Sequence, residues 1–158
     1  MPQIALLKEY PDYAPVLAFW AFREWYMERA ISFDLLIKAY KERVNDSNLP
    51  ISLIAIEDKI PVGMISLKEN DIWSRKDLNP WLSSLFVLPE YRRRGIGSLL
   101  IEHLIHRAKH LKYHTLFLFT ECENGFLENY YAKKSWEFLE KAKGNDNNFI
   151  KIYNNNLS

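Results

Sequence analysis

Hydrophobic residues follow two spacings along the chain, one typical of strands and one typical of helices. Short apolar runs, rich in β-branched and aromatic residues, have the length of strands. Two of these runs, 51–57 and 60–69, are separated only by Asp58 and Lys59, which predicts a hairpin. The predicted strands are 3–9, 51–57, 60–69, 81–88, 115–120, 136–142 and 149–153.

Apolar positions three and four residues apart predict the helices. The clearest helix runs from Ile96 to about Leu111, with an apolar stripe on one face. A helix from Pro15 to Arg29 carries its proline in the first turn, where proline is tolerated. Another begins after Ser32, a residue type that caps helix N-termini well, and a shorter one is expected over 125–134.

The element order is β-α-α-β-β-β-α-β-α-β-β. Because strands both alternate with helices and pair as hairpins, we expect an α/β (α+β) fold with one mixed, mostly antiparallel sheet. About seven strands would be flanked by about four helices. No linker rich in Pro, Gly or Ser divides the chain, so 1–153 is predicted to form one domain. The asparagine-rich residues 154–158 are expected to form a frayed tail.

Composition narrows the class of protein. The 158 residues carry a formal net charge of +1, so no global field attracts nucleic acid or an anionic membrane. Cys122 is the single cysteine, which excludes an internal disulfide and fits a reducing compartment. Neither a signal peptide nor a membrane-spanning apolar run is evident, so we expect a soluble, cytoplasmic protein. A homodimer remains compatible with these observations.

The stretch YRRRGIGSLL, residues 91–100, places charge and glycine at the start of a predicted helix. The first N–H groups of a helix lack internal partners and carry the positive end of its dipole, so they bind phosphate well. Gly95 and Gly97 allow a sharp turn and the close approach of a ligand. Arg92, Arg93 and Arg94 can donate to phosphate oxygens. Together these features predict a diphosphate site.

Two common diphosphate motifs fit this stretch poorly. The lysine of a Walker A loop is absent. A dinucleotide fingerprint would have glycine or alanine where Leu100 stands, and would follow its strand directly. Glu121, about 20 residues further on, could bind a ribose, so a dinucleotide-binding protein stays open as an alternative. An RNA site is disfavoured, because one basic triplet has no interleaved aromatic residues.

The sequence resembles the GNAT superfamily of acyl-CoA-dependent N-acyltransferases. The family loop, [Q/R]-x-x-G-x-[G/A] at the start of a long helix, matches residues 92–97. Asn124 and Tyr131 have the seven-residue spacing of a family asparagine and tyrosine. The Gly-aromatic pair that usually follows the tyrosine is replaced here by Ser135 and Trp136. The order of elements also agrees over nearly the whole chain.

This resemblance implies an acetyl-CoA-dependent acetyltransferase that acts on an amine of a small molecule or peptide. It implies that the pantetheine arm of the coenzyme pairs with the backbone of the strand before the loop, and that Tyr131 protonates the departing thiolate. The implied coenzyme-binding residues are Leu85, Phe86, Val87, Arg92, Arg93, Arg94, Gly95, Ile96, Gly97, Ser98 and Asn124. A coenzyme A sensor or interaction module without turnover is the alternative from another functional class.

The general base and the acceptor site are less clearly marked. Some family members place a carboxylate at a position that falls near Trp81 and Ser83, and neither residue is a useful base. Glu24, Asp71 and Asp77 are other candidates, and a chain of waters or a neutral amine would also serve. The aromatic residues between Phe19 and Tyr26 could line an acceptor pocket, because aromatic rings attract ammonium groups. The same residues are also expected to form hydrophobic core, and both interpretations can hold together. The predicted acceptor-site residues are Trp20, Glu24, Trp25, Asp71, Trp81 and Ser83.

Two further features are interpreted as structural. His103, His106 and His110 lie on the helix face opposite the apolar stripe, and no cysteine or carboxylate cluster joins them. We therefore expect solvated histidines and no metal site. Cys122 follows a strand without an adjacent histidine or helix start, so we expect it to be a bystander.

Overall fold

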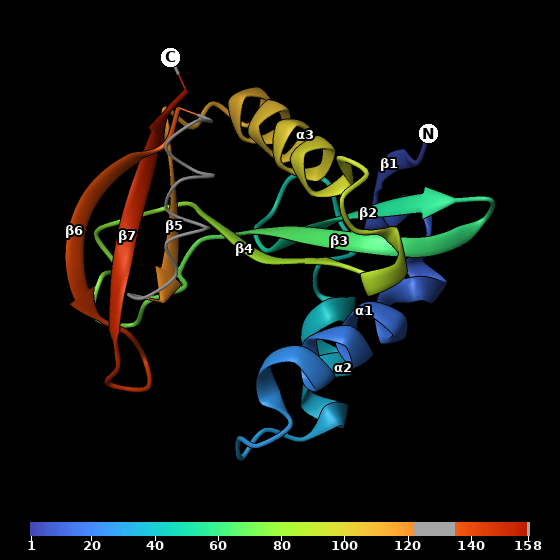
Figure 1. The fold of residues 1–158 in the computed structure, drawn as a ribbon, viewed down its shortest axis with the longest axis horizontal. Coiled ribbons are helices and arrows are strands. Elements are labelled where there is room, and N and C mark those ends of the chain that lie inside the picture. The colour runs from blue at the N-terminus through green and yellow to red at the C-terminus, as the bar shows by residue number, and fades with distance from the viewer. Residues whose placement is uncertain (122–134, 158) are drawn as a thin grey trace.

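The computed structural model describes residues 1–121 and 135–157. Seven strands form one sheet in the order β1-β2-β3-β4-β5-β7-β6 (Figure 1). All neighbouring strands are antiparallel except β4 and β5, so the predicted mixed, mostly antiparallel sheet is confirmed. The strands are β1 (Gln3–Leu6), β2 (Ile51–Glu57), β3 (Ile60–Lys68), β4 (Trp81–Val87), β5 (Thr115–Glu121), β6 (Glu137–Lys143) and β7 (Phe149–Asn156).

Three α-helices occur in the described residues: α1 (Ala14–Ala21), α2 (Phe33–Lys41) and α3 (Ile96–His110). The hydroxyl of Ser32 accepts a hydrogen bond from the Leu35 N–H, so it caps α2 as predicted. The helix expected from Pro15 to Arg29 is α-helical only to Ala21 and then widens into a π-helical turn, Phe22–Tyr26. The helix expected over 125–134 lies outside the described residues. No helix in the described ranges is both long and apolar enough to cross a membrane.

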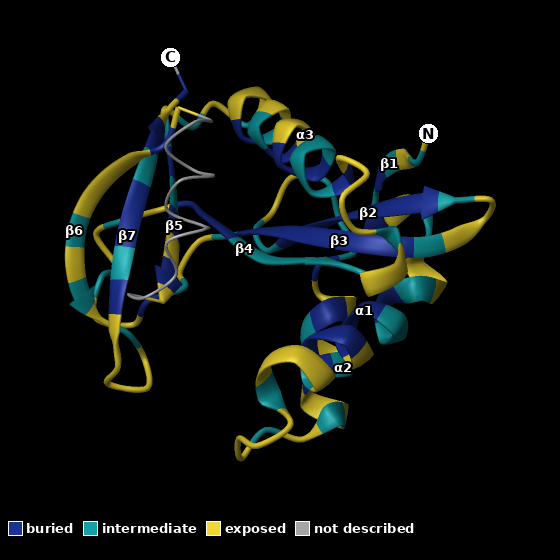
Figure 2. Ribbon diagram, viewed as in Figure 1, coloured by how far each residue is buried: buried dark blue, intermediate teal, exposed yellow. Residues whose placement is uncertain are grey.

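The helices cover the two faces of the β1–β4 part of the sheet. Helix α3 packs on one face, where Leu100 and Leu104 meet Val62 and Ile65. Helices α1 and α2 pack on the other face, against Ile54 and Met64 (Figures 1 and 2). Because both faces are covered, β2 and β3 are buried along most of their length and read as continuous apolar runs.

The sheet consists of two wings, β1–β4 and β5–β7–β6, which run in different directions (Figure 1). They join where β4 begins, through a single parallel partner pair, Trp81 and Phe117. The Phe117 N–H also donates to the carbonyl of Pro80 at 3.0 Å. Beyond this junction β4 and β5 diverge, and this divergence shapes the candidate site.

The prediction of a frayed tail over 154–158 is wrong for the part that is described. Strand β7 continues to Asn156, and its last residues pair with the start of β5. Leu157 is buried, and its N–H donates to the carbonyl of His114 at 2.9 Å. Asparagine is a poor strand former, but the backbone ladder and the burial of one leucine outweigh that preference.

A buried polar group links α2 to the sheet. Arg43 is only 7% exposed, stacks on the Tyr40 ring with its guanidinium carbon 4.0 Å from the ring centroid, and donates to the Ser66 hydroxyl at 2.8 Å. The Ser66 hydroxyl also lies 2.6 Å from that of Ser52. A buried charge is costly unless its donors are satisfied. The Ser66 hydroxyl satisfies one nitrogen of Arg43, whereas the Arg43 Nε is buried without a hydrogen-bond partner in the described residues.

We expect Ser66→Ala to lower the free energy of unfolding by roughly 1.5–3 kcal/mol, because it leaves a charged donor without its acceptor in the interior. Urea unfolding followed by circular dichroism measures this change. Ser47→Ala, at an exposed position in the loop before β2, is the control and should change stability by less than about 0.5 kcal/mol. Equal stability of Ser66→Ala and the wild type would contradict the proposed role of this hydroxyl.

Candidate active site

A β-bulge in β4 bends the strand in its middle. Met64 pairs with Phe86 and Ser66 with Ser83, so Ser84 and Leu85 together stand opposite Ile65. Ser84 has φ 57°, in the left-handed region that serine seldom adopts. Bulges bend a strand and increase its twist. The bulge therefore contributes to the divergence of β4 from β5.

The second half of β4 has one edge open. The Leu88 N–H donates to the Val62 carbonyl at 2.9 Å, which marks these two residues as a hydrogen-bonded pair of the β3–β4 ladder. Paired positions alternate along an antiparallel ladder, so Phe86 also faces β3, whereas Leu85 and Val87 turn their N–H and C=O groups to the other edge. Within the described residues no strand pairs with that edge beyond Trp81.

The loop from Arg92 to Gly95 leads from this edge into α3. Gly95 is the N-cap of α3 and has φ 80°, a conformation that favours glycine. Glycine brings no side chain that could cap the first turn. Gly97 lies in that turn, and an added Cβ there would have no atom within 4 Å. The start of α3 therefore offers an uncrowded, electropositive surface.

The three arginines have different surroundings. Arg92 donates from Nε to the Val87 carbonyl at 2.8 Å, with its guanidinium carbon 5.5 Å from the centroid of the Phe86 ring. Arg94 lies over the Tyr91 ring and 3.9 Å from a carboxylate oxygen of Glu57. Arg93 is exposed and forms no ion pair in the part of the chain that the structure describes. Arg92 thus ties the loop to β4, and its remaining nitrogens and Arg93 are placed to contact an anion.

This arrangement suits a ligand with an extended polar arm and a diphosphate. An open strand edge can hydrogen-bond an extended chain in the way that it would another strand. A helix start with adjacent arginines binds a diphosphate. Coenzyme A carries both groups in one molecule, and the residues of β4 and the 92–98 loop fit it.

Comparison with known protein families gives an independent result. The sequence model of the acetyltransferase (GNAT) family matches residues 8–136, most of the chain. The chain belongs to the GNAT acetyltransferase family. No curated protein is significantly similar to it in sequence.

Solved GNAT structures share the fold over the full length of the chain. An N-acetyltransferase from Staphylococcus aureus Mu50 is 19% identical, with a TM-score of 0.75 and coverage of 100% of this chain and 99% of that one. An aminoglycoside 6'-N-acetyltransferase complexed with coenzyme A is 14% identical, with a TM-score of 0.74 and coverage of 99% and 97%. The ribosomal-protein-S18-alanine N-acetyltransferase of Escherichia coli is 16% identical, with a TM-score of 0.71 and coverage of 100% and 95%.

Two of the predicted acceptor-site residues lie beside the open part of β4 in this GNAT chain. The Phe86 ring centroid is 5.5 Å from that of Trp20 and 6.4 Å from that of Trp25. Trp20 is buried, whereas Trp25 in the π-helical turn is 36% exposed and Glu24 beside it is exposed. The structure therefore brings Trp20 and Trp25 to the strand predicted to hold the coenzyme.

Trp81 and Ser83 lie at the other end of β4. Trp81 is fully buried, with its ring against those of Phe117 and Phe119, and its Nε1 donates to the Leu78 carbonyl. Its role in the described structure is to hold the two wings together. Ser83 is half-buried beside the bulge, with its hydroxyl 3.2 Å from that of Ser84.

Two carboxylates proposed as bases already have cationic partners. Asp71 forms a 3.0 Å ion pair with Lys68. Arg75 donates two hydrogen bonds to Asp77 and holds the pKa of that carboxyl below its usual value, which makes Asp77 a weaker base. Arg75 also binds Glu140 of β6 and so ties this loop to the β6–β7 hairpin. Glu24 stays exposed and forms no ion pair with any described residue.

The catalytic tyrosine and the asparagine predicted from the sequence, Tyr131 and Asn124, lie outside the described residues, as does Cys122. Sequence reasoning missed Ser84, whose backbone conformation produces the bulge. Serine is common in ordinary strands and turns, so its type carried no signal. Sequence reasoning also missed that Arg92 ties the loop to β4 through its hydrogen bond to the Val87 carbonyl. A contact of this kind, to a backbone carbonyl five residues earlier, has no sequence pattern that would predict it.

Proposed function

We propose that this GNAT protein is an N-acetyltransferase that moves the acetyl group of acetyl-CoA directly to an amine. The observation that carries the proposal is the open edge of β4, which leads through the Arg92–Gly95 loop to the uncapped start of α3. The open edge of β4 would bind the pantetheine arm of coenzyme A, and the start of α3 would bind its diphosphate. The two features follow each other along the protein in the same order as the two groups along the coenzyme.

In the proposed reaction the amine nitrogen forms a bond to the acetyl carbon, and the bond from that carbon to sulfur breaks. A backbone N–H on the open edge, at Leu85 or Val87, polarises the thioester carbonyl. Tyr131 gives its proton to the departing thiolate. The proton released by the amine passes through water and restores the Tyr131 hydroxyl. Of the carboxylates considered as bases, Asp71 and Asp77 are engaged by cations, and Glu24 is not engaged by any cation of the described residues.

The acceptor is proposed to be a primary amine that reaches the thioester beside Trp25. Two proteins that share this fold are named for the acetylation of amines, one on an aminoglycoside and one on a protein's alanine. The exposed face of Trp25 and the neighbouring Glu24 suit a cationic acceptor, because an aromatic face and a carboxylate both attract ammonium groups. These features are compatible with an amine of a small molecule and with an amine of a peptide, and they do not distinguish the two.

A library of amines and peptides, incubated with acetyl-CoA and assayed for free thiol, tests the proposal. We expect amine-dependent thiol release, and a several-fold higher KM for the preferred amine in Trp25→Ala with a smaller change in kcat. Trp25 is a better test position than Trp81, since removing a fully buried tryptophan costs about 3–5 kcal/mol of stability.

Two results would overturn the proposal in different ways. Binding of coenzyme A without thiol release for any amine would indicate a sensor or interaction module. Binding of NAD(P), with no effect of coenzyme A on the melting temperature, would indicate a dinucleotide-binding protein. Lys109→Gln, at an exposed position on the far half of α3, is the control variant and should keep the activity of the wild type.

A further inference from the structure

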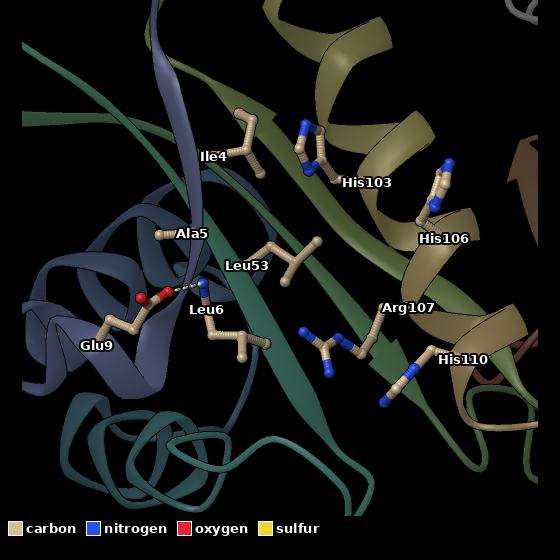
Figure 3. Close-up of a pocket in the computed structure, with 9 residues that line it drawn as sticks. All are labelled: Ile4, Ala5, Leu6, Glu9, Leu53, His103, His106, Arg107 and His110. Carbon is tan, nitrogen blue, oxygen red and sulfur yellow. Dashed lines mark hydrogen bonds between the residues drawn. The ribbon is translucent and has the colours of Figure 1, made fainter.

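A hollow of about 360 Å³ lies between α3 and the β1 edge of the sheet (Figure 3). Its volume is at the lower end of the range typical for small-molecule sites. None of the coenzyme-site residues 85–98 lines it. The lining residues are Ile4, Ala5, Leu6, Glu9, Leu53, His103, His106, Arg107 and His110.

The polar lining comes almost entirely from one helix. His103 and Arg107 are four residues apart on α3, which places them on the same face, and both side chains point toward β1 (Figure 3). His110 lies one turn beyond Arg107. The sequence predicted these histidines to be solvated, and they are exposed, but they also border this open hollow.

Arg107 is the centre of this group. It is half-buried and forms no ion pair with any described residue. The one acidic lining residue, Glu9, is instead turned to the backbone of β1, where it accepts a hydrogen bond from the Leu6 N–H at 3.1 Å. A guanidinium without a carboxylate partner, flanked by imidazoles, is a receptor for a single anionic group.

The opposite wall of the hollow is apolar. Ile4 and Leu6 of β1 and Leu53 of β2 form it, and Leu53 is buried. An inorganic anion would bind the guanidinium but leave this wall exposed to water. The wall therefore selects an anion with an apolar body.

A metal ion fits the hollow less well. No group of three or more His, Cys, Asp or Glu side chains in the described ranges lies close enough together to hold one. The fixed positive charge of Arg107 among the histidines would also repel a cation.

We propose that this hollow is a binding site for a small organic carboxylate with a short aliphatic chain. Arg107, with His103 and His110 beside it, binds the carboxylate, and the chain lies against Ile4, Leu6 and Leu53. A carboxylate is favoured over a phosphate dianion because Glu9 adds a negative charge to the lining. The proposal is independent of the acetyltransferase reaction, since the site shares no residue with the coenzyme loop.

The test is a titration of the full chain, labelled with nitrogen-15, with sodium hexanoate, followed by NMR and calorimetry. We expect saturable shifts confined to the amides of Ile4, Leu6, Leu53 and the residues around Arg107. Hexanamide, which has the same chain without the charge, and inorganic phosphate, which has the charge without the chain, should each bind at least about 10-fold more weakly.

Arg107→Gln should bind hexanoate at least about 10-fold more weakly than the wild type. Lys109→Gln, on the exposed face of the same helix, should bind it with unchanged affinity. His103→Gln, at an exposed position, should weaken hexanoate binding several-fold. It provides the test if Arg107→Gln does not fold.

Three results would each overturn the proposal. The first is the absence of saturable shifts around the hollow. The second is hexanoate binding that is unchanged in both Arg107→Gln and His103→Gln. The third is binding of phosphate or hexanamide as tightly as hexanoate, because neither has both of the groups for which the site is proposed.

Discussion

The variant Gly97→Asp is expected to bind coenzyme A about 10- to 100-fold more weakly than the wild type while folding at least as stably, because a carboxylate in the first turn of a helix is favourable for folding. Gly97 lies in the first turn of α3, and an alanine Cβ there would meet no atom within 4 Å. The protein's own packing therefore gives no reason for a glycine. A Cβ alone is compatible with the family loop, which accepts alanine at this position, but a carboxylate would stand where a phosphate of the coenzyme approaches the helix start. Losing charge-assisted hydrogen bonds of roughly 1.5–3 kcal/mol lowers the affinity by this factor.

Calorimetric titration with coenzyme A, combined with thermal unfolding of the free protein, separates the two effects. Gly95→Ala is the matched control from the same loop. Gly95 has φ 80°, so alanine is strained there by about 1–2 kcal/mol, and this variant should lose stability. If Gly97→Asp bound coenzyme A as tightly as the wild type, the phosphate would have to bind elsewhere.

Local chemistry made most of the secondary structure predictable. Asp58 and Lys59 both adopt positive φ values, as a two-residue hairpin turn requires, and they join β2 to β3 as expected. Ser32 caps α2, and the apolar stripe of α3 ends where it was predicted to, near Leu111. These features depend on neighbours in the sequence, so the sequence contains the information that determines them.

Features that depend on distant contacts were not predictable. The divergence of β4 from β5 needs the Ser84 bulge and the single Trp81–Phe117 junction, and no local pattern encodes either. Trp81 was predicted to lie in the acceptor site because it begins the strand before the loop and is aromatic. Its burial between the wings of the sheet is a property of the tertiary structure. The 92–98 loop was the exception, because charge, glycine and helix start coincide within seven residues.

Replacement of the predicted catalytic tyrosine, Tyr131→Phe, should lower kcat by about 10²- to 10⁴-fold, the usual contribution of a positioned general acid. The ring is retained and only the hydroxyl is removed, so the affinity for coenzyme A should change by less than about threefold. The pre-steady-state rate of acetyl transfer to the preferred amine measures this effect directly. A loss that appears in kcat and not in coenzyme binding would indicate that the hydroxyl acts in the transition state.

The neighbouring residue supplies the control. Tyr130 carries the same side chain, but in the helix that the sequence predicts over 125–134 adjacent residues would point about 100° apart, so only one of the two hydroxyls could reach the thiolate. Tyr130→Phe should therefore keep a kcat close to that of the wild type. If Tyr131→Phe were as active as Tyr130→Phe, proton donation to the thiolate would have to come from water. The open edge of β4 and the loop at α3 would then account for catalysis through positioning and carbonyl polarisation alone.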